Sequence, residues 1–366
     1  MSNALSTKSQ QKLLFISDGQ RVPTDAHGTG NIFQLQRIQD INTSATITRE
    51  DVFQFGQQRR IGTIVLEPPS SEVSFSYLLN NGFNESKMGF SFSDDFTVPA
   101  ASGLLDSTND NPRYFAVASG HNLHILYVPN GNDAAIYNGS DTDYRVRSIG
   151  NAFLSELSIE AAVGSIPMAN ATYMGNNTIT VQHRTGLVPS VNLDTSAAGT
   201  GSFTLPNPST GDLTVIALRP GDIGLTFGNA SLFTDIPDAR KSIQSFSISI
   251  PFSRSNKDAL GSDFGYGKDI DLPQVISINI SATVRDIKEG NLLNELNNNP
   301  QHAFTIAYND RQGNPIFAAK VVGAELQSET ASQAINDDET ADLTFTASVG
   351  AANDTTAGVF FSGAGV

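Results

Sequence analysis

Apolar and polar residues alternate one by one along much of this chain. Four segments show the pattern most clearly: 73–77, 243–250, 276–282 and 343–347. In the second of them, Phe246, Ile248 and Ile250 fall on one face and serines fall on the other. Such alternation is typical of antiparallel strands with one buried and one solvated face. Helical patterns are short, the best being 292–296 ahead of Pro300, so the sequence predicts a mainly β protein.

The predicted elements recur in the same order in two parts of the chain. Each part has a strand, a long polar loop, a strand, a Leu-Leu segment, a strand ending in Tyr with a hairpin, and two closing strands. The Leu-Leu segments 102–112 and 290–300 align without gaps, and the loop starts 49–56 and 254–261 are also alike. Because this shared order is hard to obtain by chance, we predict an internal duplication. The predicted parts are an N-terminal arm (1–30), a first domain (31–175), a connecting β segment (176–235), a second domain (236–350) and a C-terminal tail (351–366).

Composition limits the possible partners. The chain has 366 residues, with 22 Lys and Arg against 37 Asp and Glu, which gives a net charge of −15. Nucleic-acid binding depends on neutralising phosphates with basic side chains, so this acidic chain is not expected to grip DNA. The sequence contains no cysteine, which excludes disulfides and thiolate metal sites. We also expect a soluble chain, because no apolar run reaches about 18 residues and the start lacks a secretory signal.

Residues that could carry chemistry are scattered along the sequence. His121 and His124 are three positions apart on a predicted strand, so they face opposite sides and cannot share a metal; we expect exposed or edge histidines. The paired acids, such as Asp141 and Asp143, lack the spacing of a calcium loop. Phosphate-binding and nucleophile-elbow motifs are absent from the sequence. The sequence therefore predicts no enzyme, no catalytic residue, no metal and no cofactor.

Two predicted loops are longer than a compact domain usually tolerates. Residues 49–72 and 254–274 each run for about 20 residues, and loops of that length normally have a function. They combine charged residues with aromatic ones, and aromatic residues and Arg are enriched at the centres of protein interfaces. We therefore predict intersubunit or inter-ring contacts through Glu50, Asp51, Phe53, Phe55, Arg59, Arg60, Arg254, Asp258, Phe264 and Tyr266.

The order of strand, long loop and strand, best seen in 41–77 and 245–282, resembles the duplicated tail tube proteins of long-tailed bacteriophages. The resemblance is one of architecture and composition, covers roughly residues 31–175 and 236–350, and includes no diagnostic short motif. It implies two tandem β-sandwich domains, each with one short α-helix, that contribute strands to a β-barrel between subunits. Single-domain members form hexameric rings. The resemblance therefore implies a trimeric, pseudo-hexameric ring for a duplicated chain, with rings stacked into a tube.

The resemblance also implies partners and a location. The chain would bind itself and other tail proteins (tape measure, terminator and baseplate) in the virion tail, after synthesis in the host cytoplasm. DNA would pass through the tube during ejection without specific binding, and no membrane would be involved. The residues expected to face the bore are polar ones on two strands: Ser74, Ser76, Ser277, Asn279 and Ser281.

Other functions stay open at this point. The segment 176–235 and the scarcity of long helices depart from the family pattern, so another virion ring component (neck, tail terminator or baseplate) is one alternative. A non-viral tandem β-sandwich binding module is a second, although the chain has no Trp for an exposed aromatic binding face. An enzyme is the third class, and no motif in the sequence supports it.

Overall fold

The computed structural model describes residues 11–18, 32–65, 69–79, 81–90, 92–93, 105–106, 113–114, 120–128, 144–183, 223–227, 243–257, 267–271, 273–283, 301–309, 314–332, 340–349 and 357–363. In these residues the protein is mainly β, with one large, almost entirely antiparallel sheet, as the alternation predicted. The helix of the described part, α1, has five residues, and no described helix is long and apolar enough to span a membrane.

The strands divide into a first half and a second half along the chain. The first half contains β1 (Gln11–Asp18), β2 (Ile32–Gln34), β3 (Ile38–Thr46), β4 (Arg49–Val52), β5 (Gly62–Val65), β6 (Ser70–Leu78), α1 (Phe83–Lys87), β7 (Phe92–Ser93), β8 (Leu105–Asp106), β9 (Arg113–Tyr114), β10 (His121–Val128), β11 (Tyr144–Ala162), β12 (Met168–Gly175) and β13 (Asn177–His183). The second half contains β14 (Ile223–Phe227), β15 (Ile243–Pro251), β16 (Arg254–Lys257), β17 (Gly267–Ile270), β18 (Val275–Thr283), β19 (His302–Asn309), β20 (Pro315–Ser332), β21 (Thr340–Ser348) and β22 (Gly358–Gly363).

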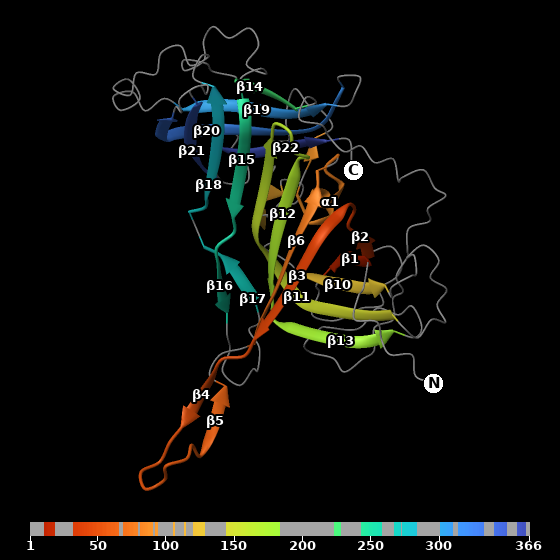
Figure 1. The fold of residues 1–366 in the computed structure, drawn as a ribbon, viewed down its shortest axis with the longest axis vertical. Helices are drawn as coiled ribbons and strands as arrows, with labels where there is room; N and C mark the ends of the chain where they lie inside the picture. The colour runs from red at the N-terminus through yellow and green to blue at the C-terminus, as the bar shows by residue number, and fades with distance from the viewer. Residues whose placement is uncertain are drawn as a thin grey trace.

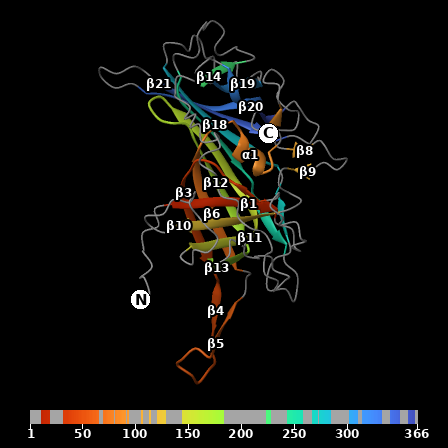
Figure 2. The ribbon, with the colours of Figure 1, turned by 90° about the vertical axis from the view of Figure 1, so that its right-hand side faces the viewer.

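Eight of these strands form one layer of the molecule, the eight-stranded sheet. Their order is β3-β6-β12-β11-β15-β18-β21-β20, and most of them run upright in Figure 1. The first part of β11 leaves this sheet to pair with β10 and β13, and the first part of β20 leaves it to pair with β19 and β22. Figure 2 shows β1, β10 and β13 running across the upright strands, which is the geometry of orthogonal sheet packing.

β-Bulges mark the places where the two long strands change layer. Against β12, the register of β11 shifts between Leu154 and Glu156; against β21, the register of β20 shifts between Leu326 and Ser328. A bulge inserts one residue on one strand of a pair, which bends that strand and increases its twist. Each long strand can therefore serve both layers without a break in the chain.

The pairing pattern of the first half recurs in the second half. The equivalent strands are β1 and β14, β3 and β15, β4 and β16, β5 and β17, β6 and β18, β10 and β19, β11 and β20, β12 and β21, and β13 and β22. Leu154 pairs with Tyr173, and Leu326 pairs with Phe345. The same constant difference in residue number therefore relates β11 to β20 and β12 to β21, and we call it the long-strand offset.

The two long loops keep the same register as well. Arg49 pairs with Val65, and Arg254 pairs with Ile270. A second constant difference in residue number, the hairpin offset, relates both strands of one hairpin to those of the other. It also relates the flanking strands β3 and β6 to β15 and β18. The likeness of the loop starts in the sequence therefore corresponds to equal positions in the ladders.

The Leu-Leu alignment cannot be compared in this way. Leu105 lies in β8, but its neighbour Leu104 and the matching Leu292 and Leu293 lie outside the described residues. The repeat is therefore supported by the strand ladders and the hairpins, not by the segment that showed it most clearly in the sequence.

Side chains at equivalent positions pack alike in the core. His121 packs edge-on against Tyr173 at 6.0 Å between ring centroids, and His302 packs edge-on against Phe345 at 5.7 Å. Both histidines are buried, and so is His124. The expectation of exposed or edge histidines was therefore wrong, because β10 lies between β1 and β11, and β19 lies between β14 and β20.

The two halves share one sheet and one core. Buried residues from both halves form a single hydrophobic cluster. β1 lies in the segment expected to be an irregular arm, β13 and β14 lie in the expected connection, and β22 lies in the expected tail, yet all four pair within the large sheet. The repeated pattern is thus wider than the domain boundaries drawn from the sequence.

Helix α1 lies where the two halves meet. The Asn84 side chain holds it to the chain between β2 and β3, since its amide donates to the Gln36 carbonyl and its oxygen accepts from the Gln36 N–H, both at 2.8 Å. After the helix, Phe90 and Phe92 pack against Phe361 of β22, with ring centroids 5.4 and 5.7 Å apart. β7 then pairs in parallel with β22. A strand of the first half thereby joins β20 and β22 of the second half.

Candidate functional site

One face of the eight-stranded sheet is polar across its whole width. A single row of paired positions crosses all eight strands: Asp40, Ser76, Asn170, Ser158, Ser249, Ser277, Thr346 and Glu325. The neighbouring row points to the core and is apolar throughout: Ile38, Tyr77, Ala169, Ile159, Ile248, Ile278, Phe345 and Leu326. The predicted bore residues Ser74, Ser76, Ser277, Asn279 and Ser281 all alternate with buried positions and so lie on this polar face.

The charges on the polar face have one sign. Six carboxylates lie on it: Asp40, Glu72, Glu156, Glu160, Glu325 and Asp342. The strand segments that build the eight-stranded sheet (β3, β6, 153–162 of β11, β12, β15, β18, β21 and 324–332 of β20) contain no Lys or Arg. The face therefore carries negative charge that no basic side chain of these strand segments compensates.

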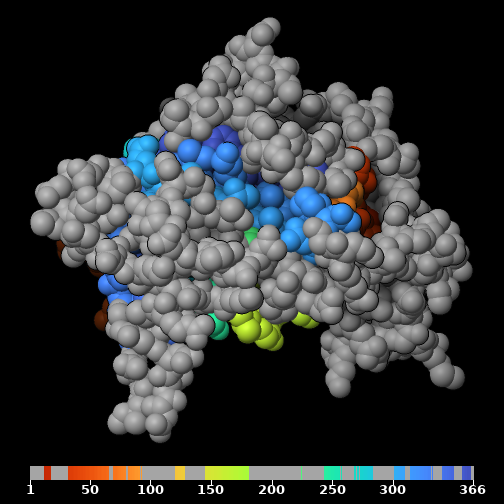
Figure 3. Space-filling model, turned by 90° about the horizontal axis from the view of Figure 1, so that it is seen from above, coloured from red at the N-terminus to blue at the C-terminus, as the bar shows by residue number. Residues whose placement is uncertain are grey.

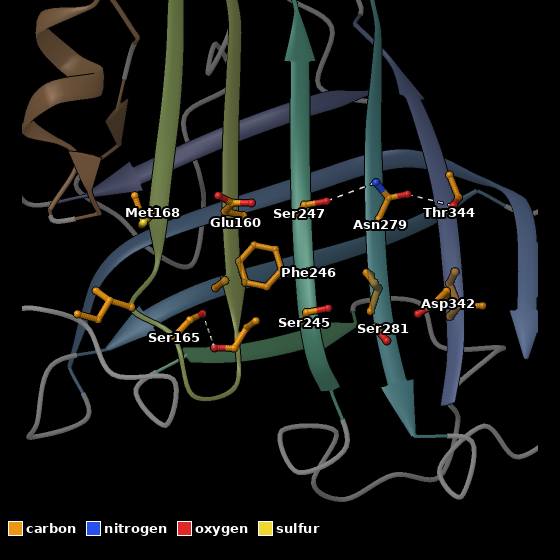
Figure 4. Close-up of a pocket in the computed structure, with 15 residues that line it drawn as sticks. Glu160, Ser165, Met168, Ser245, Phe246, Ser247, Asn279, Ser281, Asp342 and Thr344 are labelled. Atoms are coloured by element: carbon orange, nitrogen blue, oxygen red, sulfur yellow. Dashed lines mark hydrogen bonds between the residues drawn. The ribbon is translucent and has the colours of Figure 1, made fainter. Parts of the chain in front are cut away.

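A shallow hollow of about 510 Å³ lies in the middle of the polar face, where β11, β12, β15, β18 and β21 run side by side. Figure 4 shows its polar side chains pointing outward from the strands, with the second layer crossing behind them. The Asn279 amide donates to Ser247 Oγ at 3.3 Å, and the Thr344 hydroxyl donates to Asn279 Oδ1 at 3.0 Å. No cluster of three or more His, Cys, Asp or Glu able to hold a metal occurs among the described residues.

The joint between the two halves is a strand pair in the middle of this sheet. Residues 156–162 of β11 pair with residues 245–251 of β15. At the two ends of the sheet, β3 pairs only with β6, and residues 325–332 of β20 pair only with β21, among the strands that the structure describes. β15 is equivalent to β3, and β11 is equivalent to β20. The open edge of β3 therefore corresponds to the edge of β15 that pairs with β11, and the open edge of β20 corresponds to the edge of β11 that pairs with β15.

The β4–β5 hairpin stands away from the rest of the described chain (Figure 1). Its predicted contact residues are all exposed: Glu50, Asp51, Phe53, Phe55, Arg59 and Arg60. Phe53 is 67% exposed and Phe55 is fully exposed, which is unusual for aromatic side chains of this size. Arg60 and Asp51 form an ion pair with each other at 2.9 Å inside the hairpin. The opposite end of the molecule, seen in Figure 3, exposes parts of the second-half strands, drawn in blue.

The β16–β17 hairpin, by contrast, lies on the first half of its own chain. Arg254 Nε donates to the Leu154 carbonyl at 3.0 Å, and its guanidinium lies 5.2 Å from the ring centroid of Phe153. Lys268 Nζ donates to the Met174 carbonyl at 3.3 Å. Arg254 was predicted to contact another subunit, whereas here it contacts its own chain. Three further predicted contact residues lie outside the described residues: Asp258, Phe264 and Tyr266.

A buried carboxyl group lies in helix α1. Glu85 is 1% exposed and accepts a hydrogen bond from the Tyr77 hydroxyl at 2.8 Å. Burial raises the pKa of Glu85 to about 7, an effect that the hydrogen bonds to it oppose. Burial also raises the pKa of Tyr308 in β19, and the Glu85 carboxyl adds to that rise. Glu85 therefore connects the titration behaviour of the first half to a side chain of the second.

Three of these features were not predicted from the sequence. The six carboxylates of the polar face could have been found, because they occupy the same alternate positions as the serines and threonines. The open edges could not, because edge and interior strands have the same alternation. The opposite surroundings of the two hairpins could not be predicted either, since both loops have the same length and register.

Neither a scan against protein-family models nor a search of curated protein sequences found a match to this chain. The function is therefore inferred from the polar face, the open edges and the two hairpins.

Proposed function

We propose that this chain is a structural virion protein that forms the rings of a phage tail tube and conducts DNA during ejection. The observation that carries the proposal is the joint: β11 pairs with β15, and the equivalent edges of β20 and β3 stand at the two ends of the same sheet. Pairing β20 of one copy with β3 of the next would repeat that joint between chains. A head-to-tail contact of this kind can close into a ring, and closure removes edges that otherwise promote aggregation.

Because the register is the same in both halves, it predicts which residues of β20 and β3 would pair between two chains. The long-strand offset makes Thr330 the equivalent of Ser158, and the hairpin offset makes Ser44 the equivalent of Ser249. Ser158 pairs with Ser249 inside the chain, so Thr330 of one copy should pair with Ser44 of the next. The flanking pairs follow from the same two offsets: Ser328 with Thr46, Glu329 with Ala45, Ala331 with Thr43 and Ser332 with Asn42.

In this proposal each half acts as one tail-tube-like domain. Three copies form the ring with pseudo-sixfold symmetry, and each copy contributes eight strands to a closed barrel. The polar face lines the bore, because the apolar face is already covered by the crossing layer. The bore residues are then Ser74, Ser76, Ser277, Asn279 and Ser281 together with carboxylates of the polar face.

The charge of the polar face supports a conduit rather than a DNA-gripping site. A protein that neutralises six to ten phosphates changes its affinity by roughly 10³–10⁵ over a modest salt range, which measures how strongly basic walls would hold DNA. The eight-stranded sheet offers carboxylates and neutral hydroxyl and amide groups, and none of its strand segments contains Lys or Arg. Repulsion at this wall leaves DNA separated from it by water, so the DNA moves without breaking specific contacts.

The exposed β4–β5 hairpin supports contacts beyond a single chain. Large apolar side chains on a surface commonly mark interaction sites, and this hairpin exposes Phe53, Phe55, Ile61 and Ile64. In a tail tube such contacts would also hold neighbouring rings, and the end rings would meet the terminator, the baseplate and the tape measure protein. A neck, terminator or baseplate ring would use the same β20–β3 joint without stacking on itself, so tube growth distinguishes these alternatives.

Cysteine pairs can test the joint, because the natural chain has no cysteine. The double variant Thr330→Cys/Ser44→Cys should form disulfides between chains under mild oxidation, ending in a closed trimer on a non-reducing gel. The equivalent pair Ser158→Cys/Ser249→Cys should cross-link within one chain and leave a monomer band, since these residues already pair. An out-of-register pair, Ser328→Cys/Ser44→Cys, serves as the matched control and should cross-link poorly.

Negative-stain microscopy of the wild-type protein should show rings or tubes. A protein that stays monomeric at high concentration, with no cross-link between residues 330 and 44 beyond the out-of-register control, would refute the ring proposal. Rings that never stack would favour the neck, terminator or baseplate alternative.

A further inference from the structure

The docked β16–β17 hairpin shows what surrounds such a hairpin at a closed joint. Arg254, at the start of β16, lies over the Phe153 ring and donates to the Leu154 carbonyl, next to the bulge of β11. Just before it, the Phe252 N–H donates to the Ser155 carbonyl at 2.8 Å, and the Phe252 side chain is 5% exposed. The joint therefore extends beyond the β11–β15 ladder and includes the base of the hairpin.

The β4–β5 hairpin presents the equivalent positions without these contacts. The hairpin offset places Ile47 where Phe252 lies, and Arg49 where Arg254 lies. Ile47 is 51% exposed, against 5% for Phe252, and Arg49 is exposed as well. Arg49 has no ion-pair partner within the described part of its own chain. The base of this hairpin thus exposes what the other hairpin buries.

The docking surface for the β4–β5 hairpin can be located by the same correspondence. The long-strand offset makes Glu325, Leu326 and Gln327 the equivalents of residues 153, 154 and 155, all beside the bulge of β20. Two of these positions keep their role, since backbone carbonyls at 326 and 327 can accept hydrogen bonds whatever the side chain. The third position differs in its side chain, because the aromatic ring of Phe153 corresponds to the carboxylate of Glu325.

We infer that Arg49 of one chain pairs with Glu325 of the neighbouring chain in the same ring, at the position where Arg254 lies on Phe153 inside each chain. This inference rests on the proposed ring and specifies its contact surface: the base of the β4–β5 hairpin docks on the bulge of β20, and Ile47 is covered there. A guanidinium and a carboxylate form strong, directional charge-assisted hydrogen bonds. Each joint between chains then adds an ion pair to the β20–β3 ladder, whereas the joint within the chain has a cation–π contact at the equivalent position.

Salt should therefore weaken the joint between chains more than the β11–β15 joint within each chain. Screening weakens charge pairs near a surface, with a Debye length of about 10 Å at 0.1 M salt and about 3 Å at 1 M. Burial of Phe252 and stacking of Arg254 on Phe153 depend less on salt. Raising salt should loosen rings into folded single chains before it affects the fold of each chain.

A charge reversal tests the pair. We expect Arg49→Glu and Glu325→Arg each to raise the chain concentration at half-assembly by roughly tenfold or more, as measured by light scattering on a size-exclusion column. The double variant Arg49→Glu/Glu325→Arg should recover most of that loss. Glu325→Gln removes the charge while keeping the side-chain shape, so it covers the case in which Glu325→Arg does not fold. In Thr330→Cys/Ser44→Cys chains, the same variants should change the disulfide yield in parallel.

Arg145→Glu is the matched control, because it makes the same charge change on an exposed arginine in the part of β11 that pairs with β10 and β13, away from both joints. If Arg49→Glu and Glu325→Gln assemble as well as Arg145→Glu does, the inferred pair is wrong even though the ring stands. A double variant that assembles no better than the weaker single variant would overturn it too. Failure of the wild-type protein to assemble at all would instead refute the ring proposal itself.

Discussion

Equivalent residues of the two halves are alike in the core and different at the joint. In the core, His121 and His302 pack against Tyr173 and Phe345 in the same edge-on geometry. At the joint, Phe153 is replaced by Glu325, and the buried Phe252 is replaced by the exposed Ile47.

The difference shows which constraints act on each position. Core packing is dense in both halves, so each position accepts only side chains of similar size and shape. At the joint, one copy of the surface is permanently closed within the chain and the other is open. An apolar ring such as that of Phe153 suits a joint that is closed within the chain, whereas a charged group such as Glu325 suits the open edge.

The largest effect on the folded chain should come from equivalent core positions, and it should be similar in both halves. Tyr173→Ala and Phe345→Ala each remove a fully buried ring, so each should lower the free energy of unfolding by about 3–5 kcal/mol. Urea unfolding followed by circular dichroism measures this. Phe53→Ala, on the exposed hairpin, is the control and should change stability by less than about 0.5 kcal/mol. A large loss in one half only would show that the halves are not packed alike.

Glu85, which lies in helix α1 of the first half, should make the free energy of unfolding depend on pH. Its pKa is about 7 in the folded protein and 4.5 unfolded, so the folded state binds more protons between these values. Stability should therefore fall as pH rises from about 4.5 to 7 and level off above, by roughly 2–4 kcal/mol in total. Glu85→Gln should remove this slope while keeping an acceptor for Tyr77. The exposed Glu72→Gln is the control, and an unchanged slope in Glu85→Gln would contradict the assignment.

Equivalent arginines of the two hairpins should differ in their effect on the isolated chain. Arg254→Ala removes the hydrogen bonds to the Leu154 and Lys268 carbonyls and the contact with Phe153, which should cost about 1–3 kcal/mol of unfolding free energy. Arg49→Ala should cost less than about 0.5 kcal/mol, because the side chain is exposed. Thermal unfolding at a concentration that keeps the chain monomeric compares them. Equal losses would mean that the β4–β5 hairpin is docked on its own chain.

Deleting residues 53–60 should leave the fold intact and abolish polymerisation. These residues are all exposed, so their loss should hardly change the unfolding transition. Microscopy should then show folded protein without tubes. Normal tubes from this deletion would refute the role of the hairpin tip in contacts between subunits or rings.

The smallest effect is an absence of binding to DNA. With a net charge of −15 and no Lys or Arg in the strands of the eight-stranded sheet, the protein should not retard a DNA duplex in a gel. Low salt is the demanding condition, because attraction is least screened there. Tight binding at low salt would overturn the passive conduit and favour a DNA-gripping neck or packaging component.

The strands were predictable from the sequence because their alternation is strict. The segment 243–250 shows this: its serines mark the polar face and its Phe and Ile residues mark the core, as β15 confirms. The repeated order of elements was predictable as well, because each strand and each loop start can be recognised from its own short stretch of sequence. Phe246, Ile248 and Ile250 need no knowledge of the partner strand to be placed on the buried face.

The rest depends on contacts between distant parts of the chain. β1 lies in the segment expected to be an irregular arm, and its sequence does not reveal that it flanks β10 and buries His124. Arg254 and Arg49 begin equivalent hairpins, and only the tertiary fold separates the docked one from the exposed one. Glu85 also gave no signal, since a glutamate in a short polar helix normally lies in water. The environment of a residue was predictable only where it follows from near neighbours in sequence.

Fusion of the two halves changes how assembly depends on protein concentration. The β11–β15 joint is intramolecular, so its partner strands meet at an effective concentration that tethering can raise to the millimolar range. In the proposed ring, half of the joints are therefore already formed in every newly made chain. Ring formation then scales with the third power of chain concentration, whereas six separate units would require the sixth power. Such a chain can assemble early, while its copies are still scarce.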